Sequence, residues 1–147
     1  MNENIEIEVD LGSKYWDDRV PQAMVYFDDV LIFEGQVADD VTVKYSADLA
    51  EDTQHTIAVE LINKQDSDTV QDDDGAIIRD VLLTIRSVRF DGIELGYLPY
   101  REGQFFPNQT NLYAPRGIVK NCLDFGWNGR WELKFTSPAY LWLLENL

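Results

Sequence analysis

Hydrophobic and polar residues alternate along several short stretches of the chain, as they do in strands with one buried and one solvent-facing side. The first stretch places Ile5, Ile7 and Val9 between acidic residues. Similar alternation or β-rich composition recurs over residues 23–27, 30–33, 41–45, 56–63, 77–95 and 131–135. Helical periodicity is scarce, so the pattern predicts an all-β fold of about eight short strands.

The strand signal is strongest over residues 77–95, and it contains a change of phase. Ile85 continues the parity of the preceding apolar residues, whereas Val88 falls on the opposite parity. A β-bulge near Arg86-Ser87 adds one residue to the strand and restores a common buried face. We therefore predict a bulged strand here.

Turn signals separate the strands and predict an antiparallel β-sandwich of the jelly-roll type, formed as a single domain by residues 1–147. Asp28-Asp29 suits a hairpin turn. Residues 96–116, rich in proline, glycine and aromatic residues, predict one long irregular loop that is either functional or mobile. The apolar residues 138–147 lack alternation and fit either a final strand or one or two helical turns.

Charge is distributed unevenly within the net value of −15. Residues 1–74 contain 20 Asp and Glu against 4 Lys and Arg, whereas the remainder contains 7 and 8. Such a field repels phosphate backbones and argues against nucleic-acid binding. The excess negative charge favours binding of a cation or a basic partner, or it forms a solvated acidic face that only keeps the protein soluble. No apolar stretch is long enough to cross a bilayer, and the acidic N-terminus does not resemble a secretion signal, so a cytoplasmic or virion location is expected.

Candidate catalytic groups are few. Cys122 and His55 are the only residues of their types, which excludes zinc sites built from three or four such ligands. His55 precedes an alternating run and is interpreted as a strand-edge residue. Glu60 and Glu132 are acids on strands, but the sequence does not pair them across a cleft as glycoside hydrolysis requires. We therefore expect a protein that is not an enzyme.

A cluster of aspartates between two strong strands is the first candidate site. Calcium is bound by six to eight oxygen ligands, and carboxylates with free carbonyls supply them. The spacing does not follow an EF-hand, so a calcium site would be irregular and would share ligands with a second loop. A charged, soluble hairpin tip is the alternative. The candidate metal ligands are Asp66, Asp68, Asp72, Asp73, Asp74 and Asp80.

Aromatic residues concentrated in the long loop, and one near a later turn, form the second candidate site. They suit packing within the domain, a protein interface, or a platform on which sugar rings stack. Trp127 is expected to be exposed because it precedes the Asn128-Gly129 turn. The candidate ligand or interface residues are Tyr97, Tyr100, Phe105, Phe106, Tyr113 and Trp127.

Two segments around the aspartate cluster resemble the middle of calcium-dependent, xylan-binding-type carbohydrate-binding modules. The segments are residues 55–64 (HTIAVELINK) and 78–95 (IRDVLLTIRSVRFDGIEL). Val88 to Gly92 is similar to the family's turn after an acidic loop, and Asp80 stands where an acidic residue precedes the strand. The resemblance implies a β-sandwich that contacts sugar hydroxyls through calcium.

The closing segments, residues 127–135 and 140–147, look like small structural proteins of tailed phages, especially marine ones. This resemblance implies a virion or decoration component that assembles with other protein subunits, as a homo-oligomer or larger assembly. The first hypothesis is therefore a non-enzymatic phage structural or adhesion protein, with possible glycan contact. The alternative is a calcium-dependent carbohydrate-binding module.

Overall fold

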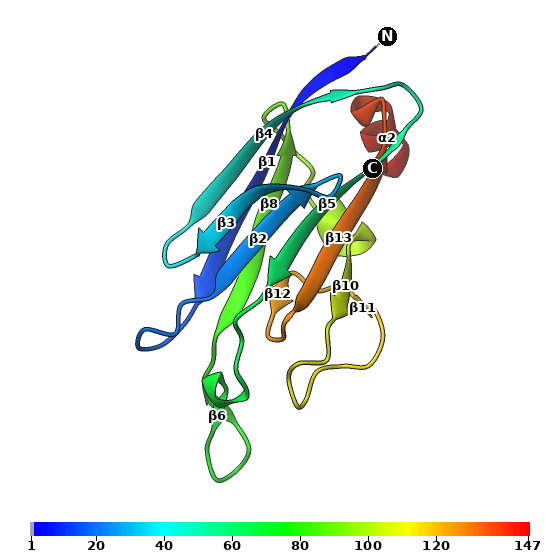
Figure 1. Cartoon of the computed structure of the whole chain (residues 1–147). Helices are drawn as coiled ribbons and strands as arrows, with labels where there is room; N and C mark the ends of the chain where they lie inside the picture. The colour runs from blue at the N-terminus through cyan, green and yellow to red at the C-terminus, as the bar shows by residue number, and fades with distance from the viewer. Residues whose placement is uncertain (1) are drawn as a thin grey trace.

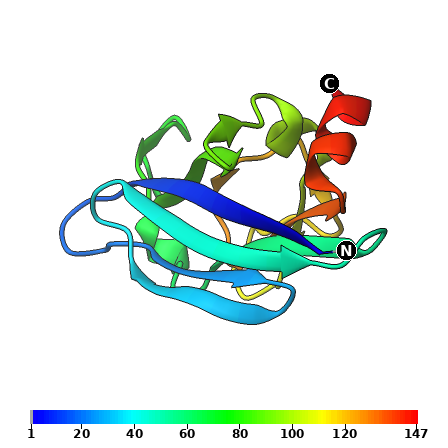
Figure 2. The ribbon, with the colours of Figure 1, turned by 90° about the horizontal axis from the view of Figure 1, so that it is seen from above.

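Two antiparallel sheets face each other and enclose the core (Figures 1 and 2). The computed structural model describes residues 2–147. The first sheet has the order β12-β8-β1-β4, with β9 paired to β8. Its strands are β12 (Asp124–Phe125), β8 (Leu82–Phe90), β1 (Glu3–Lys14), β4 (Val41–Leu49) and β9 (Ile93–Glu94).

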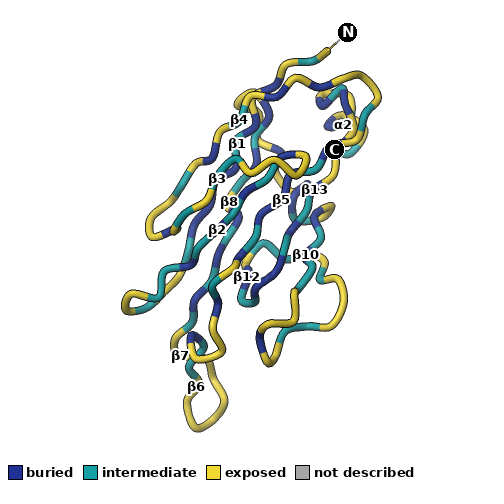
Figure 3. The backbone as a smooth tube through the Cα atoms, in the orientation of Figure 1, coloured by how far each residue is buried: buried dark blue, intermediate teal, exposed yellow. Residues whose placement is uncertain are grey.

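The second sheet has the order β11-β10-β13-β5-β2-β3. Its strands are β11 (Val119–Lys120), β10 (Gln104–Pro107), β13 (Gly129–Thr136), β5 (Gln54–Leu61), β2 (Gln22–Phe27) and β3 (Val30–Gln36). A separate hairpin, β6 (Val70–Gln71) with β7 (Ile77–Arg79), follows the short 3₁₀ helix η1 (Asp66–Asp68). It projects from one end of the sandwich, and its tip is exposed (Figure 3). The predicted antiparallel sandwich is confirmed.

The core is formed by the inward side of each alternating strand, as the sequence predicts. Ile5, Ile7 and Val9 are buried on β1. Aromatic rings fill the space between the sheets, with the Phe90 and Phe135 centroids 4.8 Å apart in a tilted arrangement. Tilted rings combine a large buried apolar area with favourable edge-to-face contact, so this pair contributes to holding the two sheets together.

The predicted bulge in β8 is present. The pairing of β1 with β8 changes register between Asp10 and Leu11, which face Ser87 and Ile85 and leave Arg86 as the additional residue. Because of that extra residue, the alternating apolar side chains before and after the bulge in β8 all face the core.

The predicted hairpin between β2 and β3 also forms. Asp28 and Asp29 have φ angles of 47° and 63°, the left-handed values that two-residue hairpin turns require. Asp28 Oδ1 accepts a hydrogen bond from the backbone N–H of Thr56 at 2.8 Å, which fastens the turn to β5.

The ambiguous C-terminal segment is a helix, α2 (Ala139–Asn146). Pro138 precedes it, and Ala139 and Leu143 face the core while the outward residues are exposed. The predicted long loop is likewise interrupted, by α1 (Leu98–Glu102) and by β10. The β10 segment becomes a sheet strand through pairing with β11 and β13, later segments of the chain that its own periodicity does not record.

His55 lies at the start of β5, as the sequence predicts for a residue at the end of a strand, and it is buried there. Its Nδ1 lies 2.6 Å from Asp28 Oδ2, and its Nε2 lies 2.7 Å from Thr53 Oγ1. The ring also stacks on Phe27 with centroids 5.8 Å apart. These contacts satisfy both ring nitrogens and connect the β2–β3 turn with the start of β5.

Replacing Phe90 by alanine tests the aromatic contact between the sheets. Phe90 is fully buried, so we expect the free energy of unfolding to fall by about 3–5 kcal/mol in urea titrations, through lost burial and a residual cavity. Leu144→Ala is the control, since Leu144 is 70% exposed, and it should change that free energy by less than about 0.5 kcal/mol. Equal effects of the two substitutions would contradict the proposed packing.

Candidate functional site

A hollow of about 380 Å³ opens at the end of the sandwich, beside the β6–β7 hairpin and the loop that leads from β10 to β11. It brings together members of both sequence-predicted groups: Asp66 and Asp80 from the aspartate cluster, and Tyr113 and Trp127 from the aromatic set. We call it the first hollow. Its lining is Lys64, Asp66, Thr69, Gln71, Ile77, Asp80, Leu82, Asn111, Tyr113, Asp124, Gly126 and Trp127.

A buried ion pair forms one wall of the first hollow. Lys64 is 6% exposed, and its Nζ donates to Asp80 Oδ1 at 2.6 Å and to the carbonyl of Val81 at 2.7 Å. The Thr69 hydroxyl donates to the same carboxylate oxygen at 2.7 Å. Burial acts to raise the pKa of Asp80, but the hydrogen bonds and the Lys64 charge outweigh it and leave the pKa below its usual value.

Two buried amides hold the backbone of Lys64 in place. Asn128 Oδ1 accepts from the Lys64 N–H at 2.7 Å, and Asn128 Nδ2 donates to the Lys64 carbonyl at 2.9 Å. Asn111 Nδ2 donates to the same carbonyl at 3.0 Å, while Asn111 Oδ1 accepts from the Asn128 N–H at 2.7 Å. The loop after β10 and the turn before β13 are thus attached to the end of β5. The sequence shows Asn128 only as a turn residue and gives no signal for Asn111.

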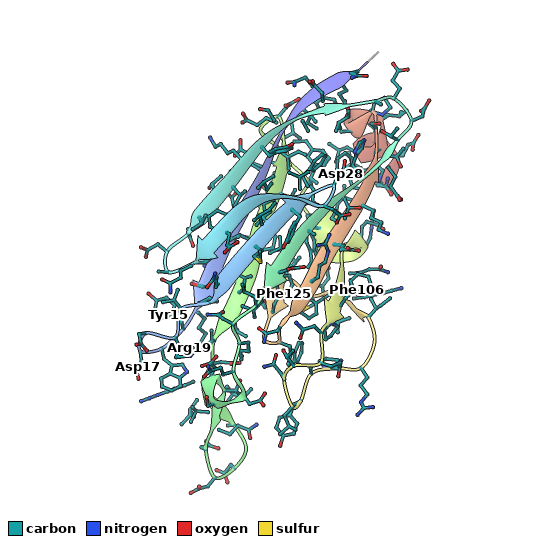
Figure 4. The ribbon with its side chains drawn as sticks, in the orientation of Figure 1. Tyr15, Asp17, Arg19, Asp28, Phe106 and Phe125 are labelled. Carbon is teal, nitrogen blue, oxygen red and sulfur yellow. The ribbon has the colours of Figure 1, made fainter. Side chains whose placement is uncertain are left out.

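The base of the hairpin is fixed by a second ion pair, between Arg19 and Asp68. Arg19 Nε and Nη2 donate to the two carboxylate oxygens at 2.6 and 2.9 Å, and the Asp68 side chain is 1% exposed. Trp16 Nε1 donates to the Asp68 carbonyl at 2.8 Å, so the β1–β2 loop, which carries Arg19 in Figure 4, is anchored on η1. Burial acts to raise the pKa of Asp68, and the Arg19 and backbone hydrogen bonds outweigh it and lower that pKa.

The other predicted metal ligands are engaged locally or lie apart. Asp72 Oδ1 accepts from the N–H groups of Asp74 and Ala76, both at 2.9 Å, and so closes the hairpin tip. Asp73 and Asp74 are exposed at that tip. Asp66 Oδ1 accepts from the Leu112 N–H at 2.9 Å.

The aspartates therefore do not fit a calcium ion in this arrangement. Within residues 2–147, no three or more His, Cys, Asp or Glu side chains are grouped so that they could hold a metal ion. Asp68 and Asp80 are already neutralised by Arg19 and Lys64. The ligand number that calcium requires is not assembled.

The predicted aromatic set is divided among three places. Phe105 is fully buried on β10, and its ring centroid lies 4.8 Å from that of Phe125, which is also fully buried and is labelled in Figure 4. The expectation that Phe105 contacts a ligand or partner is therefore wrong. The β10 alternation turns Phe105 inward and leaves its neighbour Phe106 half-buried at the sheet surface. Tyr97 and Tyr100 lie together at α1, with ring centroids 5.0 Å apart.

The two remaining aromatics lie in the first hollow. Tyr113 is 84% exposed. Trp127 is half-buried against the core, not fully exposed as expected. An exposed and an immobilised ring thus share the hollow with Asp66 and Asp80.

Glu60 and Glu132, which the sequence does not pair, meet on one cation. Arg130 Nε donates to Glu132 at 2.8 Å, and Arg130 Nη1 lies 3.4 Å from Glu60 Oε2. The guanidinium also lies over the Tyr26 ring, 5.0 Å from its centroid. The two acids are therefore joined by a guanidinium on the outer face of the second sheet, and neither lines the first hollow.

No protein-family model and no curated protein matches this chain. The fold is shared with solved structures of a carbohydrate-binding module. A structure described as vCBM60 in complex with galactobiose is 9% identical over 87% of this chain and 96% of the other, with a TM-score of 0.50. A selenomethionine form of vCBM60, from work on two families of calcium-dependent carbohydrate-binding modules, is 10% identical over 88% and 89%, with a TM-score of 0.51. These likenesses establish a carbohydrate-binding-module-like fold.

Stability should fall in acid because the two ion-paired aspartates have lowered pKa values. A folded-state pKa below the unfolded value stabilises the protein above the unfolded pKa, and that stabilisation is lost as pH falls through the folded pKa. Asp80→Asn should cost about 3–5 kcal/mol of unfolding free energy at neutral pH, since Lys64 loses its partner. It should also make the loss between about pH 5 and 3 shallower than in the wild type.

Denaturant titrations across that pH range measure both effects, with Asp73→Asn at the exposed hairpin tip as the control. The control should reproduce the wild-type slope. An Asp80→Asn slope equal to that of the wild type would refute the assigned role of the ion pair.

Calcium should leave the thermal stability unchanged, because Asp68 and Asp80 are ion-paired, Asp72 closes the hairpin tip, and the remaining aspartates do not assemble the six to eight ligands that calcium requires. A ligand that binds only the folded state at 100 times its Kd would add about 2.7 kcal/mol, a readily measured shift in Tm. We expect equal Tm values in millimolar calcium and in excess chelator, measured by scanning calorimetry. A rise in Tm with calcium that Asp66→Asn or Asp80→Asn removes would instead establish a metal site there.

Proposed function

We propose that this protein is a non-catalytic glycan-binding domain and that the first hollow is its binding site. One observation carries the proposal: Tyr113 and Trp127, from separate loops, line the same hollow as the carboxylates of Asp66 and Asp80. The carbohydrate-binding-module-like fold supports it, and vCBM60 is described in complex with galactobiose. The galactobiose complex is a property of vCBM60, and the binding experiments below identify the glycan that this protein binds.

The chemistry of the lining suits a sugar ring. The C–H faces of a pyranose are apolar and pack on aromatic rings, while its hydroxyls seek hydrogen-bond partners at the ring edge. Trp127 is held by the core and offers a ring that loses little freedom on binding. Tyr113 is exposed and can close over a ligand.

The carboxylates retain capacity for ligand hydroxyls. Among residues 2–147, the hydrogen bonds donated to Asp80 all reach Oδ1, which leaves Oδ2 free to accept. Asp124 also lines the hollow, and its Oδ1 accepts from the Thr84 hydroxyl at 2.7 Å. Ion-paired or hydrogen-bonded carboxylates of this kind are preorganised acceptors, because their orientation is fixed before the ligand arrives.

The first hypothesis from the sequence, a virion component that assembles with other subunits, receives no support from the comparisons and stays a prediction. The expected virion or cytoplasmic location also stays a prediction. Within residues 2–147, none of the helices has the length and apolar character of a membrane span.

Removal of either ring tests the proposed site. We expect Trp127→Ala and Tyr113→Ala each to weaken polysaccharide binding by about tenfold or more, the equivalent of about 1.4 kcal/mol per tenfold. Affinity electrophoresis through gels containing soluble galactan, xylan or mixed-linkage glucan measures the effect. Tyr113→Ala should not affect folding, since Tyr113 is 84% exposed, so it separates lost contact from lost stability.

Tyr15→Ala is the matched control, because Tyr15 is a partly exposed tyrosine on the β1–β2 loop and lies outside the hollow (Figure 4). It should migrate as the wild type does. Full retardation of both the Trp127 and the Tyr113 variants would rule out the hollow as the glycan site.

A further inference from the structure

A second hollow, of about 480 Å³, adjoins the first and has the side chain of Asp124 in common with it. We propose that the two hollows form one groove that binds an extended, uncharged polysaccharide chain, with an aromatic contact at each end. This inference rests on the proposed function and specifies the length and charge of the ligand. The second hollow is lined by Thr84, Ile85, Arg86, Tyr100, Asn121, Cys122, Leu123 and Asp124.

Strand β8 provides the continuity between the two hollows. Leu82 lines the first hollow, and Thr84, the next residue on the same side of the strand, lines the second. Asp124 on β12 pairs with Thr84 in register, so its carboxylate stands at the boundary. From Leu82 to Arg86 the strand covers about 13 Å at about 3.3 Å per residue, which is longer than one sugar ring.

Each end of this path has an aromatic residue. Trp127 lies in the first hollow and Tyr100 in the second. Tyr100 is half-buried and packs against Tyr97, with centroids 5.0 Å apart and an interplanar angle of 48°, so its ring has a supported orientation. Separate stacking positions on one ligand act together, because the second contact becomes intramolecular once the first is made.

Polar side chains line the second hollow together with the apolar side chains of Ile85 and Leu123. Thr84, Asp124 and Asn121 offer hydroxyl, carboxylate and amide groups to the hydroxyls of a chain that lies across them. Rings at the ends with hydrogen-bonding groups between them match a polymer of sugar units, each of which has an apolar face and a polar edge.

Charge selects against an acidic polymer. The two cations of the lining are both occupied, Lys64 by Asp80 at 2.6 Å and Arg86 by Asp40 at 3.0 Å. Asp66 and Asp124 have no basic partner within 4.0 Å among residues 2–147, so the groove has excess negative charge. A uronic acid chain would meet like charges without a free counterion, which disfavours its binding.

Calorimetric titration of the full chain with disaccharides and hexasaccharides of the galactose, xylose and glucose series tests the groove. We expect the best hexasaccharide to bind at least tenfold more tightly than its disaccharide, and hexagalacturonate to bind at least tenfold more weakly than the neutral hexasaccharides. Tyr100→Ala should remove the length advantage and bring hexasaccharide affinity down to the level of the disaccharide.

A blocking variant gives an independent readout. Thr84→Trp places a bulky side chain at the boundary on a strand that tolerates aromatic residues, and should reduce hexasaccharide affinity to the disaccharide level. Tyr15→Ala should keep the full length advantage. Unchanged melting temperatures would show that both groove variants are folded, and for a variant that fails this check Asp124→Asn, a near-isosteric change at the same boundary, takes its place.

The outcomes separate the two proposals. Binding of no saccharide at all would overturn the proposed function together with the groove. Disaccharide and hexasaccharide binding of equal strength, abolished by Trp127→Ala, would overturn the groove alone and leave a single-site module. Tighter binding of hexagalacturonate than of neutral chains would overturn the assigned ligand charge.

Discussion

The buried ammonium of Lys64 is the constraint on which the functional end of the molecule depends. A charge removed from water is costly unless it is paired and hydrogen-bonded, and here the ammonium finds both kinds of partner just before the next long strand. Lys64 Nζ donates hydrogen bonds to the Asp80 carboxylate and the Val81 carbonyl. Asn111 and Asn128 bind the backbone carbonyl of Lys64 through their side-chain amides. The end of β5, the start of β8 and the loop after β10 must therefore meet at one point, and the first hollow is the space left around that point.

Pairing of aspartates with basic side chains also explains why residues 2–147, although rich in aspartate, contain no group of carboxylates that could hold a metal ion. A carboxylate that is buried beside an ammonium or a guanidinium has already gained the charge partner that a metal ion would supply. Asp68 and Asp80 are used in this way, and Asp72 closes a turn. The chain shares its fold with a calcium-dependent module at 10% identity or less, and a shared fold leaves the chemistry of the site to be determined by its own residues.

Strand periodicity predicted the sandwich well because burial repeats every second residue. The change of parity in β8 predicted a bulge near Arg86-Ser87, and the structure has the additional residue at Arg86. What the pattern could not provide was any feature that depends on a distant partner. Phe105 was assigned to a loop because four residues of β10 give little periodic signal, and only its pairing with β13 turns the ring inward. Asn111 is a polar loop residue by sequence, and its burial follows from a hydrogen bond to Lys64, 47 positions away.

The uneven charge of the sequence also changes meaning once the chain is folded. Strands from the acidic half lie beside strands from the nearly neutral half in both sheets, so cations of the second half meet acids of the first. Arg89 pairs with Glu8 and Asp10, and Arg130 pairs with Asp29 and Glu60. The faces of the sandwich are therefore partly neutralised. If the two halves of the sequence formed separate surfaces, one would be acidic and the other neutral, and these ion pairs would not form. Uncompensated carboxylates persist in the groove, where the cations of the lining are already occupied. An uncharged, hydroxyl-rich ligand suits such a surface, because it can donate hydrogen bonds to fixed acceptors without adding charge of either sign.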